Sequence, residues 1–284
     1  MVHRPEWLAH TELQDPEVSA AMAHVDFDQP NIARIYDYLL GGSTHFAVDR
    51  EVGGELVRLF PEQSEYATFA RAFLGRAVRT LVTEYGIDQF LDLGSGIPTV
   101  GNVHEIAHQA NPHARVAYVD WETIAVSHSR RLLGDDEHRV TVTQADVAAP
   151  ESVLAAPGVA GLLDFSRPIA VIAVGILDII HTPHTQGLLN RYRAACAAGS
   201  ALVLSHEAQL AASDEQIAGL REQFARTSTP DLRLRTRDEV AQLLDGASLL
   251  QPGVVPTAAW RPERPVTEHE AARSNAYAAV GLLH

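Results

Sequence analysis

Five short apolar runs, separated by stretches with helical spacing, constrain the fold of this 284-residue chain more than any other feature. An unbroken apolar run is typical of a strand buried on both faces of a parallel sheet, and alternation with helices indicates successive βαβ units. The sequence therefore predicts a doubly wound, Rossmann-like α/β sheet. The runs are QFLDL (89–93), RVAYVD (115–120), VTVTQAD (140–146), IAVIAVGIL (169–177) and SALVLSHE (200–207).

The residues before the first run have a different pattern. Residues 1–25 are polar and aperiodic, and we expect them to be flexible. In residues 26–62 the apolar spacing is helical, and Gly41 and Gly42 separate two short helices. We expect this segment to cover the ligand site as a lid, because no other stretch of the chain is free to do so. Residues 63–284 would then form the ligand-binding α/β domain, in one structural unit with the lid.

The charge balance limits the partners of the chain. Its formal net charge is −14, so phosphate backbones and anionic membrane surfaces would be repelled. The single cysteine, Cys196, allows no disulfide framework. Residues 1–17 lack the apolar core of a secretory leader and no apolar run reaches membrane length, so we expect neither a signal peptide nor a membrane span. These features predict a cytoplasmic protein that acts on a small-molecule substrate, without nucleic acid or membrane partners. A homodimer is compatible with them.

The first apolar run ends in the glycine turn DLGSG, at the strand edge where doubly wound folds bind ligands. Gly94 and Gly96 allow the backbone to turn tightly and to approach a ligand. Aspartates mark the ends of three successive runs, at Asp92, Asp120 and Asp146. We expect Asp120 to accept hydrogen bonds from ribose hydroxyls and Asp146 to lie near an adenine amino group. Together these residues predict a site for an adenosine without a phosphate tail.

The same loop distinguishes S-adenosylmethionine from NAD. A dinucleotide-binding loop has a third glycine, where this chain has Thr99, and Asp92 would repel a pyrophosphate. Asp92 would instead face the ammonium group of a methionine moiety. The sequence therefore predicts S-adenosyl-L-methionine as the cofactor and disfavours an NAD enzyme.

A second motif, HEIAH (104–108), matches the H-E-x-x-H pattern of zinc hydrolases. A zinc site needs a third protein ligand. Asn111 and Ala114 occupy the positions where the extended motif would place glycine and histidine. The helix also follows the glycine loop, so its apolar side would face the sheet. We therefore predict no metal site.

Several segments resemble a known family, the actinobacterial S-adenosylmethionine-dependent methyltransferases formerly described as a domain of unknown function. The resemblance covers most of the chain from about residue 25. It implies a class I methyltransferase fold: a seven-stranded sheet whose last strand is antiparallel, with N-terminal helices over the cofactor. The segments are PNIARIYDYLLGG, FAVDRE, RAFLGRAVRTL, QFLDLGSGIPTVGNVHEIA, ARVAYVD, QADV, LVLSH and PGVVPTAAWRP.

Methyl transfer requires an aligned donor and acceptor, exclusion of water and, for some acceptors, a base. His45, Asp178 and His181 are the candidate catalytic bases. Aromatic side chains of the lid are candidates to face the cationic sulfonium, and Trp121 is a candidate to stack on adenine. The aromatic candidates and the remaining predicted cofactor contacts are Tyr36, Tyr38, Gly41, Phe46, Ser95, Thr99, Val147 and Gly175.

Departures from the family pattern leave other reactions open. The chain has STHF (43–46) after the paired glycines, WET (121–123) after the second run and DI (178–179) after the fourth, where the family often has other residues. These differences cluster around the expected site. The main prediction is a methyltransferase that acts on an unidentified small molecule. The alternatives are cyclisation or aminocarboxypropyl transfer from the same cofactor, and a non-catalytic S-adenosylmethionine-binding protein.

Overall fold

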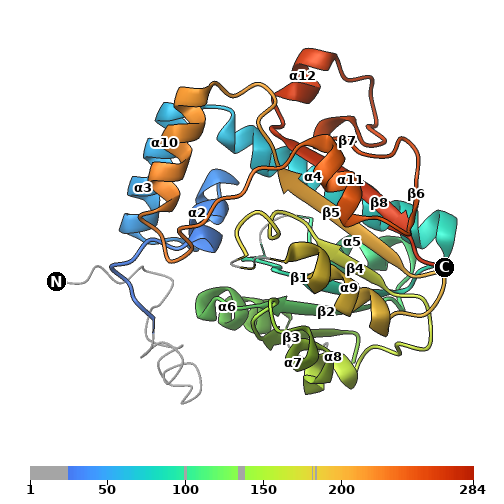
Figure 1. Cartoon of the computed structure of the whole chain (residues 1–284). Helices are drawn as coiled ribbons and strands as arrows, with labels where there is room; N and C mark the ends of the chain where they lie inside the picture. Colours follow the sequence, from blue (N-terminus) through green and yellow to red (C-terminus); the bar gives the residue numbers. More distant parts are fainter. Residues whose placement is uncertain (1–24, 99–100, 134–137, 181, 183) are drawn as a thin grey trace.

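The structure of the protein is a computed structural model that describes residues 25–98, 101–133, 138–180, 182 and 184–284 (Figure 1). Its centre is a sheet with the strand order β3-β2-β1-β4-β5-β8-β6, with the short β7 paired to β8 beside this path. Strands β1 to β5 are parallel, and β8 is antiparallel to both β5 and β6. The strands are β1 (Gln89–Leu93), β2 (Arg115–Asp120), β3 (Val140–Gln144), β4 (Ala170–Ala173), β5 (Ala201–Glu207), β6 (Ser248–Leu249), β7 (Val255–Pro256) and β8 (Ala276–Leu282).

This order confirms the predicted doubly wound sheet of seven strands with the last strand antiparallel. All residues of β1, β4 and β5 are buried, as expected for strands covered on both faces. Strand β3 differs, because it lies at the edge of the sheet and is mostly half-exposed. Its alternating sequence VTVTQ suits an edge strand with one covered face.

Helices cover the two faces of the sheet. Helices α4 and α5 pack on one face, together with the buried indole of Trp260, and α7, α8, α9 and α11 pack on the other. Consecutive strand residues such as Phe90 and Leu91 contribute to opposite layers. These helices are α4 (Gln63–Tyr85), α5 (Val103–Ala110), α7 (Pro150–Ala155), α8 (Pro157–Ala160), α9 (Thr185–Ala195) and α11 (Arg237–Leu243); α6 (Thr123–Leu133), the 3-10 helix η3 (Thr257–Ala259) and α12 (Glu268–Ala272) complete this part of the chain. None of the described helices has the length and apolar character of a membrane span.

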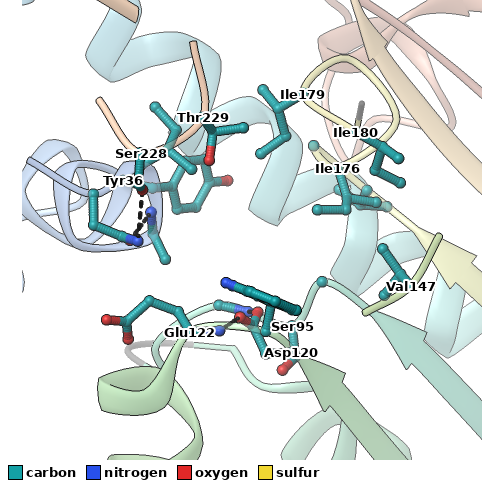
Figure 2. Close-up of a pocket in the computed structure, with 18 of the residues that line it drawn as sticks. Tyr36, Ser95, Asp120, Glu122, Val147, Ile176, Ile179, Ile180, Ser228 and Thr229 are labelled. Carbon is teal, nitrogen blue, oxygen red and sulfur yellow. Dashed lines mark hydrogen bonds between the residues drawn. The ribbon is translucent and has the colours of Figure 1, made fainter. Parts of the chain in front are cut away.

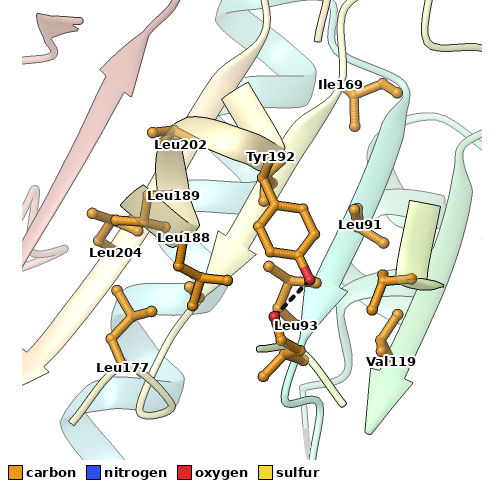
Figure 3. Close-up of a cluster of buried hydrophobic side chains, with 14 of the residues drawn as sticks. Leu91, Leu93, Val119, Ile169, Leu177, Leu188, Leu189, Tyr192, Leu202 and Leu204 are labelled. Atoms are coloured by element: carbon orange, nitrogen blue, oxygen red, sulfur yellow. Dashed lines mark hydrogen bonds between the residues drawn. The ribbon is translucent and has the colours of Figure 1, made fainter. Parts of the chain in front are cut away.

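One side chain connects this packing to the carboxyl end of β3. The ring of Tyr192 on α9 is buried among leucines of the sheet, and its hydroxyl donates a hydrogen bond of 2.9 Å to the carbonyl oxygen of Val147 (Figure 3). A buried tyrosine hydroxyl needs such a partner. The bond fixes the loop after β3, which carries Asp146 and Val147.

The N-terminal helices α2 (Ile32–Leu39) and α3 (Ala47–Leu59) pack beside α10 (Asp214–Phe224), as Figure 1 shows. Ile35, Leu56 and Leu220 are members of one buried apolar cluster that joins the three helices. The segment is therefore packed against a distant part of the chain. The N-terminal stretch predicted to be flexible lies, except for Val25, outside the described residues.

A tight turn ends α2 at the sequence DYLLGG. The N–H groups of Gly41 and Gly42 donate to the carbonyl oxygens of Tyr38 and Asp37, at 3.0 and 2.8 Å, which is the Schellman pattern. Gly41 has a φ of 76°, a conformation that strains other residues. At Gly42 a Cβ atom would come within 2.0 Å of the Asp37 carboxylate. Both glycines are thus required to terminate the helix and redirect the chain into α3.

Candidate active site

A cavity of about 540 Å³ lies at the carboxyl ends of β1, β2 and β3 and beside the loop after β4 (Figure 2). Its volume is within the range of about 300–1,000 Å³ that small-molecule sites occupy. The side chains and glycines that line it come from α2, α4, four strand ends and a loop before α11. They are Asn31, Ile32, Ala33, Tyr36, Arg71, Leu74, Asp92, Gly94, Ser95, Gly96, Asp120, Trp121, Glu122, Asp146, Val147, Ala148, Val174, Gly175, Ile176, Ile179, Ile180, Ser228, Thr229, Pro230 and Asp231.

The glycine turn after β1 forms one wall of this cavity. Gly94 and Gly96 have φ values of 70° and 65°, and a Cβ atom on Gly94 would lie only 2.5 Å from the side chain of Ile176. The N–H of Gly94 donates to the carbonyl oxygen of Val119 at 2.8 Å, which holds the turn against β2. The hydroxyl oxygen of Ser95 is buried and has no hydrogen-bond partner within the described part of the chain. A ligand group can therefore bind it.

Asp120 is positioned by two backbone groups. One carboxylate oxygen accepts from the N–H of Gly96 at 2.7 Å, and the other accepts from the N–H of Glu122 at 2.8 Å. Burial raises the pKa of Asp120, and these two hydrogen bonds oppose the effect. Each oxygen of a carboxylate accepts two hydrogen bonds, so both have capacity left for ligand hydroxyls.

Asp92 and Arg71 bring opposite charges to the same cavity. Burial raises the pKa of Asp92 to about 7, the charge of Arg71 lowers it, and the charge of Asp120 raises it. Arg71 extends from α4, and its guanidinium carbon lies 5.8 Å from the ring centre of Tyr36. No described carboxylate forms an ion pair with Arg71. Its charge is thus available for an anionic ligand group.

Sequence reasoning missed Arg71 and Glu122 as site residues. Arg71 begins the segment RAFLGRAVRTL, which indicated an amphipathic helix and gave no signal that this side chain reaches a cavity. Glu122 follows the second strand and accepts a hydrogen bond from the N–H of Ala125 at 2.6 Å. It also pairs with the buried Arg34 of α2 at 3.1 Å. Burial raises the pKa of Glu122 to about 7, and Arg34 opposes that shift.

Besides Tyr36 of α2, nine of the predicted cofactor residues line this cavity. They come from the three strand ends, the glycine turn and the loop after β4, and their presence there agrees with the predicted edge of the sheet. Trp121 is 71% exposed and forms part of the rim. The nine are Asp92, Gly94, Ser95, Gly96, Asp120, Trp121, Asp146, Val147 and Gly175.

Four predicted residues of the N-terminal segment do not line this cavity. Helix α2 directs Tyr36 toward it, and Tyr38, two residues later, lies on another side of the helix and packs against Gly53. Gly41 serves the turn after α2. His45 contacts the Asp37 carboxylate through Nδ1 at 3.0 Å, and the ring centre of Phe46 lies 4.6 Å from the Arg34 guanidinium. The expectation that these residues face the cofactor therefore has no support in the cavity lining.

The other predicted residues are located elsewhere. Asp178 is buried beside the cavity and lines a smaller, adjacent one. Thr99 and His181 lie outside the described residues. The catalytic role predicted for His45 likewise finds no geometric support, because its ring is engaged with Asp37 in the turn between α2 and α3.

The cover of the cavity has two parts, and only one was predicted. Besides α2, the loop 228–231 lines it. The amide of Asn31 donates to the hydroxyl of Ser228 at 3.1 Å, and the N–H of Ser228 donates to the carbonyl oxygen of Pro30 at 3.0 Å. The expectation that no stretch other than residues 26–62 is free to cover the site was therefore wrong. The loop escaped prediction because its sequence, STPD, has no periodic pattern.

The residues of HEIAH have structural contacts. The Glu105 carboxylate accepts from the N–H of Asn102 at 3.0 Å and so caps α5. His104 Nδ1 lies 2.8 Å from the hydroxyl of Tyr118, and His108 Nε2 lies 2.9 Å from the carbonyl oxygen of Ala114. The motif thus fixes α5 to the neighbouring strand and loop.

The strand order, the glycine turn and the acidic strand ends define the class I fold of S-adenosylmethionine-dependent methyltransferases. The S-adenosyl methyltransferase family model matches residues 18–284, and the chain belongs to this family. Membership confirms the resemblance drawn from the sequence. It identifies the chain as a methyltransferase of a family that uses S-adenosyl-L-methionine.

Two solved structures from actinobacteria are similar over nearly their whole length. One is a protein from Thermobifida fusca YX whose assignment as a methyltransferase is provisional. It is 38% identical to this chain, with 91% of this chain and 96% of that chain covered and a TM-score of 0.85. The other, a DUF574 family protein from Streptomyces avermitilis, is 32% identical, with 91% and 99% covered and a TM-score of 0.84. No curated protein matches the chain.

Proposed function

We propose that the chain transfers the methyl group of S-adenosylmethionine to a small-molecule acceptor. The observation that carries this proposal is the division of the cavity into two chemically different halves. A polar half, with Asp120 and Glu122, lies at the ends of the first strands (Figure 2). Ile179 and Ile180, together with Ile176, which packs against the glycine turn, form an apolar half. One half suits a nucleoside with charged groups, and the other suits the body of an organic acceptor.

The polar half offers a partner for each group of S-adenosylmethionine, which supplies an electrophilic methyl group when bound. Arg71 and the unpartnered hydroxyl of Ser95 would bind the carboxylate of the methionine moiety. Asp92 would face its ammonium group, and Asp120 would accept the ribose hydroxyls. At the rim, Trp121 would cover the adenine, beside the other predicted adenine contacts at the end of β3.

The apolar half would hold the acceptor against the methyl group and keep water out. Tyr36 on α2 and the loop 228–231 close this side of the cavity. The net charge of −14 gives the protein no attraction for a nucleic acid backbone. An uncharged or cationic small molecule is therefore the acceptor class that the site favours.

The test is to incubate the protein with S-adenosylmethionine labelled in its methyl group and a protein-free extract of small molecules. We expect the label to move into one small-molecule fraction, with an equal amount of S-adenosylhomocysteine formed. Asp120→Ala should slow the transfer when S-adenosylmethionine is below saturation, because it weakens cofactor binding. Asp88→Ala is the control, because Asp88 lies just before the amino end of the neighbouring strand β1, away from the cavity, and pairs with Arg167 at 2.7 Å.

Other outcomes would redirect the assignment. Formation of methylthioadenosine would indicate aminocarboxypropyl transfer or cyclisation in place of methyl transfer. Binding of the cofactor without turnover in any fraction would support a binding protein. Transfer of the label to added RNA, DNA or protein would exclude the proposed class of acceptor.

A further inference from the structure

A second, smaller cavity of about 30 Å³ lies directly beside the main one. Tyr36, Gly175 and Ile179 are among the residues that line both cavities, so the two cavities adjoin each other along these residues. The small cavity also contains two acidic side chains, Asp178 from the loop after β4 and Glu207 from the end of β5. We call the small cavity, with Tyr36, Gln63, Tyr66, Asp178 and Glu207 as its polar lining, the acid pocket.

The acceptor oxygens of the acid pocket receive few hydrogen bonds. Asp178 and Glu207 are only 3% and 2% exposed. The Tyr66 hydroxyl donates to one oxygen of Asp178 at 3.4 Å, and the amide of Gln63 donates to Glu207 at 3.2 Å. The hydroxyl of Tyr36 donates outside the pocket, to the carbonyl oxygen of Ala67 at 3.1 Å.

Two buried acceptors of the acid pocket have no partner among the described residues. They are Oδ1 of Asp178 and Oε1 of Gln63, whose side chain is 2% exposed. Buried acceptors of this kind are costly unless a ligand or water supplies the missing donor. A group that donates hydrogen bonds to both acceptors would satisfy the pocket.

The charge of the pocket also favours a cationic group that donates hydrogen bonds. Burial raises the pKa of Glu207 to about 8, and the neighbouring Asp178 adds to that shift. Burial also raises the pKa of Asp178 to about 6. Burial and mutual repulsion thus favour a proton shared between the two carboxyl groups. The charge of Arg235 lowers the pKa of Asp178, but no described residue forms an ion pair with either carboxylate. A positive charge between the two acids would oppose both upward shifts.

The remaining walls suit a compact organic cation. The rings of Tyr36, Tyr66 and Phe224 and several aliphatic side chains surround the two acids. Aromatic faces attract ammonium groups, and a volume of about 30 Å³ has room for such a group but not for a larger one. A ligand with its ammonium in the acid pocket would place its apolar body toward Ile179 and the apolar half of the main cavity.

We propose that the acid pocket binds a protonated amine, and that the acceptor of the methyl group is an apolar molecule whose ammonium group is recognised there. The ammonium nitrogen has no free electron pair, so a different atom of the acceptor, in the main cavity, forms the bond to the methyl group as the S–CH3 bond breaks, and any proton on that atom passes to solvent. The identification of this ligand as the acceptor rests on the proposed function. The binding of the amine follows from the pocket alone. The two statements can therefore fail separately.

The experiment is calorimetry on the full chain, first with S-adenosylhomocysteine and then with three probes of similar shape. The probes are 2-phenylethylamine, the neutral 2-phenylethanol and the anionic phenylacetate. We expect the amine to bind about 10-fold or more tightly than the alcohol, because hydrogen bonds to a charged partner are the stronger ones. Phenylacetate should not bind.

Isosteric variants assign the effect to the pocket. Glu207→Gln and Asp178→Asn should each weaken binding of the amine about 10-fold or more while leaving S-adenosylhomocysteine binding within about two-fold. The control is Glu65→Gln, which removes an acid of α4 that pairs with Arg273 outside the pocket. The selectivity of the unmodified protein for amine over alcohol tests the proposal even where a variant does not fold.

Three results would overturn the inference. The alcohol could bind as tightly as the amine, the folded variants could bind the amine unchanged, or S-adenosylhomocysteine alone could bind, in which case the pocket holds ordered water only. Failure of S-adenosylhomocysteine to bind would instead refute the proposed function. The selectivity among the three probes would then still decide whether the pocket takes an amine.

Discussion

Arg71→Met should weaken binding of S-adenosylhomocysteine but leave binding of 5′-methylthioadenosine nearly unchanged. The two ligands share the adenosine, and only the first carries the amino-acid end. Methionine keeps the apolar stem of the side chain and removes the charge and every donor. The difference between the two ligands therefore isolates what the guanidinium contributes.

The size of the effect follows from the surroundings of Arg71. A hydrogen bond to a charged partner contributes about 1.5–3 kcal/mol, which corresponds to about 10- to 150-fold in Kd. The pKa of Asp92 is raised to about 7 by burial, and the charge of Arg71 keeps it from rising further. Removal of that charge would keep Asp92 protonated at neutral pH, and the ligand ammonium would lose part of its partner. Both changes weaken the same ligand, so about 10-fold is the smallest loss expected.

Calorimetry with both ligands at about pH 7.5 would measure the effect, because most side-chain acids are ionised at that pH. The control is Arg79→Met, on the same helix, whose side chain is 51% exposed and pairs with Glu263 at 3.3 Å. This control should bind both ligands as the unmodified protein does. Equal losses for both ligands would indicate a general disturbance of the site, and an unchanged affinity for S-adenosylhomocysteine would refute the role of Arg71.

Three further predictions concern other groups. Asp120→Ala should weaken binding of S-adenosylhomocysteine by about 1–3 kcal/mol by calorimetry, because two hydroxyls lose a charged acceptor; unchanged affinity in a folded variant would exclude the ribose role. Glu207→Gln should raise the free energy of unfolding in urea more at about pH 8 than at about pH 5. The pKa of Glu207 is 4.5 in the unfolded chain and about 8 in the folded protein. Between these two pH values the unfolded chain releases a proton that the folded protein retains. The unmodified protein therefore loses stability as the pH rises through this range. Elemental analysis should find no stoichiometric zinc, whereas one zinc per chain that is lost in His104→Ala would restore the metal reading of HEIAH.

The sheet and the convergence of its strand ends on one cavity were predictable because their signals are local. Each buried strand is one apolar run, and the carboxyl ends of parallel strands meet at one edge. Residues at the ends of separate runs, such as Asp92 and Asp120, therefore had to converge. The glycine turn was equally local, since the positive φ of Gly94 and its contact with Ile176 exclude side chains there.

The covering elements were predicted less well because their signals are not local. Helical spacing located α2, but it did not determine which side of the helix faces the cavity. Aromatic residues on both sides, Tyr36 and Tyr38, were equal candidates until the packing against α3 and α10 fixed the rotation. The loop 228–231 joins the cover through hydrogen bonds to Asn31 and Pro30, nearly two hundred residues earlier in the chain. No spacing rule connects such positions.

Glu207 shows why an acidic strand end does not by itself define a role. Like Asp120, it is the last residue of a buried strand, and burial raises the pKa of both. At the end of β2, the backbone N–H of Glu122 and that of Gly96 in the glycine turn oppose that shift and favour the ionised carboxylate. Over β5 lies the first turn of α4, where the one opposing hydrogen bond comes from the side chain of Gln63. In the roles proposed for them, the same position in two strands would provide an acceptor for neutral hydroxyls in one case and a proton-sharing acid suited to a cation in the other. What differs is the donor that the covering element supplies, and that element is remote in sequence.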